Sequence, residues 1–381
     1  MVNFFGYKNN FDDFITLVRK NEKRILAIYN LIYLFFTALI FAYFLFPIFI
    51  RILEKRNILD APNRRKIHEV ETPSMGGIPI FLAVTFSLLI WLPFDIPDWF
   101  KYLIGALVLV FIIGLRDDLI PLKPQYKLIN QLIPSIMVIY FSGIILDSFY
   151  GLFYIEDIPT ILSWFLTLIV IVVITNSFNL IDGIDGLAGF IGLVMLTSFG
   201  TWFYMIEMNI LSYLIFSFIG AIFSFLIFNW QPSKIFMGDT GALLIGFLLA
   251  CVAISFINAN YNLNVDHPYK FKATISTALC VMIIPLWDTL RVFILRVIIS
   301  RSPFTADKNH IHHLLLRLGL SHTKINLLLA TVNLLFISIA VLGRKLSDHV
   351  LLPVIIGIAI VLSIILKKIV DERKKSLLHS T

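Results

Sequence analysis

Residues 161–190 read ILSWFLTLIVIVVITNSFNLIDGIDGLAGF and join an apolar run to a polar cluster. The first half is almost wholly apolar, as in a helix that crosses a bilayer. Asn176, Asn179, Asp182 and Asp185 then follow at every third position, with a glycine after each aspartate. The stretch therefore predicts a membrane helix that delivers oxygen-bearing side chains to the membrane surface.

The composition of the whole chain also indicates a membrane protein. Hydrophobic residues make up 59% and charged residues 14% of the 381 residues, against roughly 45–50% and about 25% in soluble domains. Apolar runs recur along the chain, which predicts an all-α, polytopic integral membrane helical bundle with about 11 transmembrane helices. The expected spans are 29–50, 76–94, 101–115, 128–146, 160–175, 187–206, 210–228, 241–258, 274–294, 324–343 and 350–367.

The distribution of positive charge predicts the orientation of these spans. The net charge of +7 does not point to nucleic acid here, because cytoplasmic loops of membrane proteins are rich in Lys and Arg. The odd-numbered loops and the C-terminus hold twenty such residues, and the alternate loops hold five. We therefore expect a multi-pass membrane protein with its odd-numbered loops and C-terminus on the cytoplasmic face.

The chain is expected to form a single membrane domain with two short flanking segments. Residues 29–368 form the transmembrane catalytic domain, and residues 369–381 a basic cytoplasmic tail. Residues 1–28 would lie outside, yet they contain five Lys and Arg residues. We interpret this N-terminal segment as an amphipathic helix in the membrane interface.

Five polar clusters fall on the predicted cytoplasmic side. They contain the sequences TPSMGG, RDDLIPLKPQYK, NSFNLIDGIDGLAG, FMGDTGALLIG and DKNHIHH. Any one acid has an ordinary explanation: Asp117 and Asp118 as solvated loop acids, and Asp182, Asp185 and Asp239 as helix caps. If the acids converge, however, two carboxylates about 5 Å apart repel by roughly 3 kcal/mol at an effective dielectric of 20. Oxygen-rich ligands without thiolates suit Mg²⁺ or Mn²⁺. The nearby basic side chains would then face phosphate oxygens, and they are Lys66, Lys123, Lys127, Arg301 and Lys308.

The HIHH sequence adds His310, His312 and His313 on the same side. A zinc site is one reading, but no cysteine or fourth ligand is suitably spaced. A second interpretation is that these histidines lie at the membrane interface and have no functional role. Beside phosphate, the three histidines would donate hydrogen bonds or assist proton transfer.

Together these motifs resemble the polyprenyl-phosphate N-acetylhexosamine-1-phosphate transferase family over about residues 30–325. The resemblance implies transfer of a sugar phosphate from a UDP-sugar to a membrane polyprenyl phosphate, with release of UMP and a requirement for Mg²⁺ or Mn²⁺. DKNHIHH is similar to the branch that uses UDP-GlcNAc and undecaprenyl phosphate to prime O-antigen, common antigen or teichoic-acid linkage units. The peptidoglycan branch has three contiguous histidines, which Ile311 interrupts here.

The resemblance also implies roles for individual residues. Asp117 and Asp118 match the acidic pair near the attacking phosphate, and Lys127 a phosphate contact. Asn179 and Asp239 match the metal-contacting positions. The remaining matches are Asp185 on the nucleotide side, Phe236 stacking on uracil, and His310, His312 and His313 beside the diphosphate. We also place Asp182 among the catalytic residues, because the same helix delivers it to the level of the lipid headgroups.

The expected reaction is attack of a polyprenyl-phosphate oxygen on the β-phosphorus of UDP-GlcNAc. Asp117 would take the last proton, or an aspartate would attack first and form a covalent intermediate. Another UDP-N-acetylhexosamine or UDP-MurNAc-pentapeptide is the alternative substrate, and a homodimer is left open. An ion-coupled transporter is the rival class, but it should have acids near mid-bilayer rather than at span ends. The basic loop 296–323 is expected to contact the sugar and to determine which sugar the enzyme accepts.

Overall fold

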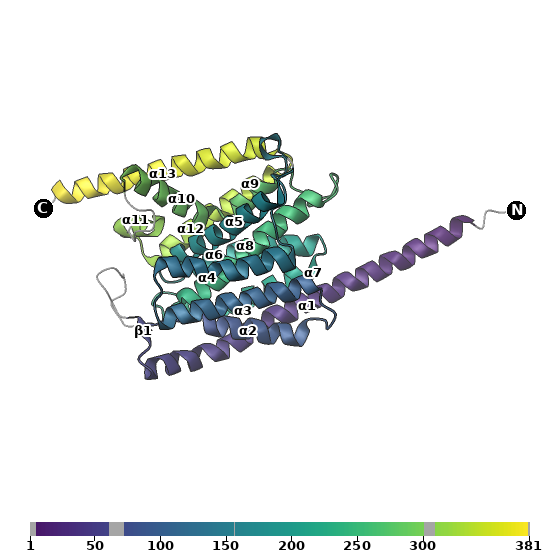
Figure 1. Ribbon diagram of the computed structural model, residues 1–381, viewed down its shortest axis with the longest axis horizontal. Coiled ribbons are helices and arrows are strands. Elements are labelled where there is room, and N and C mark those ends of the chain that lie inside the picture. The colour runs from purple at the N-terminus through teal and green to yellow at the C-terminus, as the bar shows by residue number, and fades with distance from the viewer. Residues whose placement is uncertain (1–4, 61–71, 156, 301–308, 380–381) are drawn as a thin grey trace.

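The computed structural model describes residues 5–60, 72–155, 157–300 and 309–379, and it is a bundle of helices that run side by side (Figure 1). Its α-helices are α1 (Phe5–Lys55), α2 (Gly77–Trp91), α3 (Asp98–Leu119), α4 (Pro124–Met137), α5 (Thr160–Ile181), α6 (Leu187–Met205), α7 (Asn209–Asn229), α8 (Gly238–Asn262), α9 (Thr274–Val281), α10 (Ile283–Ile298), α11 (Ile311–Arg317), α12 (His322–Leu342) and α13 (Asp348–His379). A π-helical turn η1 (Val138–Ser142), a 3₁₀ turn η2 (Leu152–Tyr154) and two short strands, β1 (Leu59–Asp60) and β2 (Thr72–Pro73), complete the described elements.

The structure confirms an all-α polytopic membrane protein, and each of the eleven predicted segments is helical. Within the described residues, eight helices are long and apolar enough to cross a membrane, or nine if α9 and α10 count as one span. The other two predicted segments are α2, which has 15 residues, and α4, which η1 continues. Helices dominate because each satisfies its own backbone hydrogen bonds within lipid.

The core of the bundle is α8, which is apolar and buried on almost every side. An all-round hydrophobic helix is stable only when other helices surround it, and α3 and α5 pack closely along it. Close approach to its start depends on glycine. A Cβ at Gly114 of α3 would lie 2.6 Å from the Thr240 Cα, well inside van der Waals contact. The first turn of α8 is therefore fixed against neighbouring backbone.

One predicted span is broken rather than straight. Helices α9 and α10 meet at Met282 with a bend of 87°. The end of α10 then lies near α11 at the end of the bundle where β1 is also found (Figure 1). This end receives the C-terminal ends of α3 and α5 and the N-terminal ends of α4 and α8, and most of the predicted site residues lie on these ends.

Helix α1 is continuous from Phe5 to Lys55 and projects beyond the bundle on the side opposite α11 (Figure 1). It has no break near residue 28, the predicted boundary of the N-terminal segment. At that side Arg24 donates two hydrogen bonds to Glu207 Oε1, at 2.8 and 3.1 Å. The placement of the N-terminal segment in the membrane interface stays a prediction.

Candidate active site

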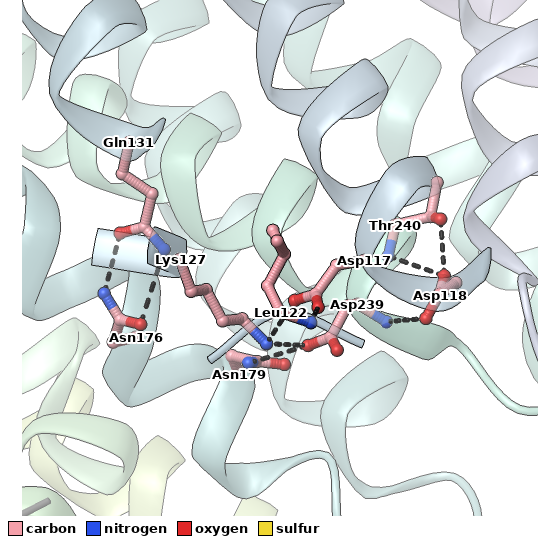
Figure 2. Close-up of polar contacts among 9 residues, drawn as sticks. All are labelled: Asp117, Asp118, Leu122, Lys127, Gln131, Asn176, Asn179, Asp239 and Thr240. Carbon is pink, nitrogen blue, oxygen red and sulfur yellow. Dashed lines mark hydrogen bonds and ion pairs between the residues drawn. The ribbon is translucent and has the colours of Figure 1, made fainter. Parts of the chain in front are cut away.

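A chain of charged side chains joins three helices at the polar end of the bundle. The Lys127 ammonium at the start of α4 lies 3.0 Å from Asp117 Oδ2 of α3 and also contacts Asp239 Oδ1 of α8 (Figure 2). The Asp117 side chain is almost fully buried, and its other oxygen accepts from the Leu122 backbone N–H at 2.7 Å. Two carboxylates thus hold one lysine between them, at the position where the sequence predicts a phosphate contact.

Asp118 points elsewhere, as expected for adjacent residues on a helix. Its carboxylate accepts from the backbone N–H groups of Asp239 at 2.8 Å and Thr240 at 2.9 Å, and from the Thr240 hydroxyl at 2.5 Å (Figure 2). These donors belong to the first turn of α8, whose N–H groups have no partners within the helix. Asp118 therefore caps α8 from the neighbouring helix and sets the position of Asp239.

The preceding Gly238 permits this cap. Its φ is +71°, and a Cβ there would lie 2.6 Å from Asp118 Oδ2. A residue with a side chain would be strained in backbone conformation and would collide with the capping carboxylate. The GDTG sequence thus combines one glycine for a close approach with one acid, Asp239, that faces the site.

The end of α5 supplies the side chains of the opening stretch. Asn179 donates through Nδ2 to Asp239 Oδ1 at 3.0 Å, so these two predicted metal contacts are adjacent (Figure 2). Asn176 instead donates to Gln131 Oε1 at 2.7 Å, which ties α5 to α4. Asp182 follows the last helical residue, and burial together with the negative charges of Asp239, Asp118 and Asp185 raises its pKa to about 7.

The resemblance implies that Asp185 and Phe236 contact the nucleotide. The Asp185 side chain is buried; it accepts from the Ser233 hydroxyl at 3.0 Å and lies 3.3 Å from His322 Nδ1. Phe236 is half-buried in the segment before α8, where its backbone N–H donates to Pro73 O at 2.8 Å. The segment between α7 and α8 thus contains Phe236 itself and Ser233, which bonds Asp185. The roles of Asp185 and Phe236 stay predictions.

The three histidines lie at and just after the start of α11, close to the turn after α5. The His312 ring packs against Gly183, where an added Cβ would collide with His312 Nε2. His310 and His312 have ring centroids 5.9 Å apart, and those of His312 and His313 are 4.3 Å apart. Burial, with the neighbouring His313, lowers the pKa of His312 to about 3, so this ring is neutral at physiological pH.

Several residues that sequence reasoning missed support this arrangement. Asp288 on α10 is 2% exposed, and its Oδ2 lies 2.9 Å from His310 Nδ1. A lone acid within the apolar run IIPLWDTLRVFIL was the available signal. Ser233 and His322, the neighbours of Asp185, had no comparable signal. The predicted contacts Lys66, Arg301 and Lys308 lie outside the described residues.

The residues at the end of α5 and the start of α8 fit a hard divalent cation. Mg²⁺ typically takes one or two protein carboxylates, with waters and substrate phosphates as its other ligands. Asp239 supplies such a carboxylate, and the Asn179 amide oxygen is a second donor beside it. The described residues contain no group of three or more His, Cys, Asp or Glu side chains arranged to hold a metal ion by themselves. The donor set therefore suits a cation shared with a phosphate substrate rather than a closed zinc site.

Comparison with known proteins identifies the family. Residues 100–257 match the model of glycosyl transferase family 4. A probable undecaprenyl-phosphate N-acetylglucosaminyl 1-phosphate transferase of Bacillus subtilis is 30% identical over 337 residues, which cover 87% of this chain and 90% of the relative. Undecaprenyl-phosphate alpha-N-acetylglucosaminyl 1-phosphate transferases of Yersinia pestis and Pasteurella multocida are 30% and 33% identical, over 84% and 79% of this chain and 84% and 83% of the relatives. The chain therefore belongs to glycosyl transferase family 4.

Proposed function

We propose that this enzyme transfers N-acetylglucosamine-1-phosphate from UDP-GlcNAc to undecaprenyl phosphate, giving undecaprenyl-diphosphate-GlcNAc and UMP. The reaction takes place at the polar end of the bundle, which faces the cytoplasm of a bacterial inner membrane. A soluble nucleotide reaches this end from the water, and the lipid phosphate reaches it from the bilayer. The product would initiate a cell-surface polysaccharide.

The observation that carries the proposal is the ion-pair chain of Asp117, Lys127 and Asp239 in a member of this family. These three side chains lie at the ends of α3, α4 and α8, and the lysine ammonium is held by two carboxylates. An ammonium group in this position is suited to a phosphate oxygen. Relatives similar over most of their length are named as transferases of this sugar phosphate to undecaprenyl phosphate.

The transfer forms one bond and breaks one. A phosphate oxygen of the lipid attacks the β-phosphorus, the bond from that phosphorus to the bridging oxygen breaks, and UMP leaves with the bonding electrons. Lys127 exchanges a carboxylate contact for the transferring phosphate and stabilises its charge. Asp117 accepts the last proton of the lipid phosphate, a small task because the second pKa of a phosphate monoester is near 6.

A divalent cation supplies charge neutralisation on the diphosphate. Asn179 and Asp239 are the residues that would hold it. Asp118 fixes the backbone of Asp239 through the cap on α8, so that the carboxylate cannot drift from the site. The histidines of α11 complete the wall of the site beside the Asp182 turn and donate to phosphate oxygens.

The direct test is incorporation of label. Purified enzyme with undecaprenyl phosphate, Mg²⁺ and UDP-GlcNAc labelled in the sugar should transfer label into a butanol-extractable lipid and release unlabelled UMP in equal amount. Omission of undecaprenyl phosphate is the control. Release of UMP without labelled lipid, or no transfer at all by folded enzyme, contradicts the proposal.

The sugar is tested by competition. When enzyme receives UDP-GlcNAc and UDP-MurNAc-pentapeptide together, lipid should be labelled with GlcNAc-1-phosphate only, because Ile311 interrupts the three contiguous histidines of the peptidoglycan branch. We expect a preference of at least about 100-fold, since rejection of a large group that does not fit exceeds the roughly 10- to 200-fold discrimination of a single methylene. Transfer of both sugars at comparable rates would remove the assignment to GlcNAc but keep the family.

Phe236 is expected to affect nucleotide binding. Phe236→Ala should raise the Michaelis constant for UDP-GlcNAc by a factor equivalent to about 1–3 kcal/mol, the usual value of base stacking on an aromatic ring. Turnover at saturating nucleotide should change little. Phe228→Ala, on the aromatic cluster with Phe46 within the bundle, is the matched control and should leave the constant unchanged. An unaltered constant in Phe236→Ala places the ring outside the nucleotide site.

A further inference from the structure

The buried carboxylate of Asp288 on α10 binds an arginine of its own helix and two residues at the start of α11. Asp288 Oδ1 accepts from Arg291 Nη2 at 2.9 Å and from the Ile311 backbone N–H at 2.9 Å. Asp288 Oδ2 lies 2.9 Å from His310 Nδ1. Arg291 also donates to the Asn309 carbonyl oxygen. One aspartate and one arginine, a turn apart on α10, thus fasten residues 309–311 at the start of α11.

This arrangement determines which nitrogen of His310 carries a proton. An ionised carboxylate only accepts hydrogen bonds, so Nδ1 must donate to Asp288. In neutral His310 the proton is therefore on Nδ1, and Nε2 is free to take up a second proton while the ionised Asp288 stabilises the resulting imidazolium. The protonated Nε2 then donates to the transferring phosphate. Nε2 has no hydrogen-bond partner among the described residues.

His310 is joined to the reaction site by the rest of its cluster. Its ring stacks on His312 with an interplanar angle of 10°, and His312 packs against Gly183, next to Asp182. The position of α11 relative to the turn after α5 thus depends on how α10 holds its first residues. Within the part of the chain that the structure describes, Asp288 is bonded to Arg291, Ile311 and His310, and of these only His310 is a predicted substrate contact.

We propose that Asp288 is a positioning residue for the transfer reaction, which fixes the tautomer and orientation of His310. The inference rests on the proposed function, because it assigns His310 a contact with the transferring phosphate. Carboxylates that orient a metal-bound histidine in this way typically contribute a factor of 10 to 100 in activity, and we expect an effect of the same size here. Nothing in the sequence motifs of the resemblance includes Asp288.

Asp288→Asn changes the tautomer with little change in shape. The Oδ1 position accepts from two donors, Arg291 and Ile311, so the amide oxygen of asparagine must occupy it. The amide NH₂ then faces His310 Nδ1 and can only donate to it. His310 must then carry its single proton on Nε2 and cannot become an imidazolium while this contact is kept, although the cap on α11 and the contact with Arg291 remain.

We expect Asp288→Asn to lower kcat by about 10- to 100-fold while the Michaelis constant for UDP-GlcNAc changes less than about twofold. In ¹⁵N-histidine-labelled enzyme, the His310 resonances should change from the Nδ1–H to the Nε2–H pattern. In a His310→Ala background, Asp288→Asn should cause no further loss, because a residue that acts only through His310 has nothing left to position.

Asp348→Asn is the matched control. Asp348 is also a buried aspartate that holds a helix start, since it accepts from Ser276 N at 2.6 Å near the start of α9. It is the first residue of α13, and α13 begins at the end of the bundle opposite α11 (Figure 1). Its substitution should lower the thermal midpoint and leave kcat unchanged. In the His310→Ala background it should lower the thermal midpoint by the same amount and again leave kcat unchanged.

Two results overturn the inference. One is a loss from Asp288→Asn that persists in full on the His310→Ala background. The other is an Nδ1–H pattern for His310 in Asp288→Asn. Absence of labelled lipid with wild-type enzyme would instead contradict the proposed function, and the tautomer measurement still decides the role of Asp288 in that case, because it needs no turnover.

Discussion

Asp239→Asn should lower turnover by at least about 1000-fold, the upper range for loss of one preorganised electrostatic contact. Asp239 Oδ1 contacts both Lys127 and the Asn179 amide, so this single oxygen joins the lysine to the proposed cation site. An asparagine keeps the shape of the side chain but removes its charge. Asp118 bonds the backbone N–H of residue 239, so the cap on α8 and the fold should survive.

Measurement of transfer in Mg²⁺ and in EDTA checks the reason for this loss. Wild-type enzyme should be active in Mg²⁺ and inactive in EDTA, and Asp239→Asn should be inactive in both while it is recovered from membranes in the normal amount. Asp98→Asn is the control, because Asp98 is an exposed acid paired with Lys101 away from the site and should retain full activity. Equal wild-type activity in EDTA and Mg²⁺ would falsify the assignment of a metal to Asp239 and Asn179.

The helical segments were predictable because lipid leaves the backbone little choice. A long apolar run must satisfy its own hydrogen bonds, so each predicted span is helical. Lengths and breaks were harder to predict. Residues 274–294 read as one apolar run, but α9 and α10 meet at 87°. Pro285 was the local signal for a break, because it has no N–H to donate to the Val281 carbonyl, but a proline alone does not fix the angle. The bend depends on how the two halves pack against other helices.

The convergence of the acids was predictable from charge bias, but their partners were not. Asp117 and Asp118 are adjacent, and helix geometry indicates that they point apart. In the fold, Asp117 faces Lys127 and Asp118 caps α8. These partners depend on where α4 and α8 lie in space, which the sequence pattern does not give. Asp288 was missed for the same reason. Its partner His310 is 22 residues later, beyond the end of α10, and only the fold brings them together.

The buried acids also bear on the rival interpretation as an ion-coupled transporter. Asp288 lies within an apolar helix, as an acid on an ion path would. Both of its oxygens, however, are bonded within the protein, to Arg291, the Ile311 N–H and His310. Asp348, the acid at the start of α13, is bonded to Ser276. Both acids therefore hold helix starts in place.

Lys127→Met should abolish transfer, with a loss of at least about 1000-fold, because it removes the one ammonium shared by Asp117 and Asp239. It should also destabilise the protein. The Asp117 side chain is 4% exposed and would lose its ion-pair partner. Breaking a fully buried pair costs roughly 3–5 kcal/mol. Lys127 is 17% and Asp239 30% exposed, so a smaller cost of about 2–3 kcal/mol is expected.

The two effects of Lys127→Met are separated by a second substitution. Asp117→Asn added to Lys127→Met removes the buried charge that has lost its partner, and its Oδ1 can still accept from the Leu122 N–H. The thermal midpoint should therefore return most of the way to the wild-type value. Activity should not return, because the double variant lacks both the positive charge next to the transferring phosphate and the carboxylate that accepts the lipid-phosphate proton. If transfer recovers together with the midpoint, Lys127 serves only to neutralise Asp117 and has no contact with substrate.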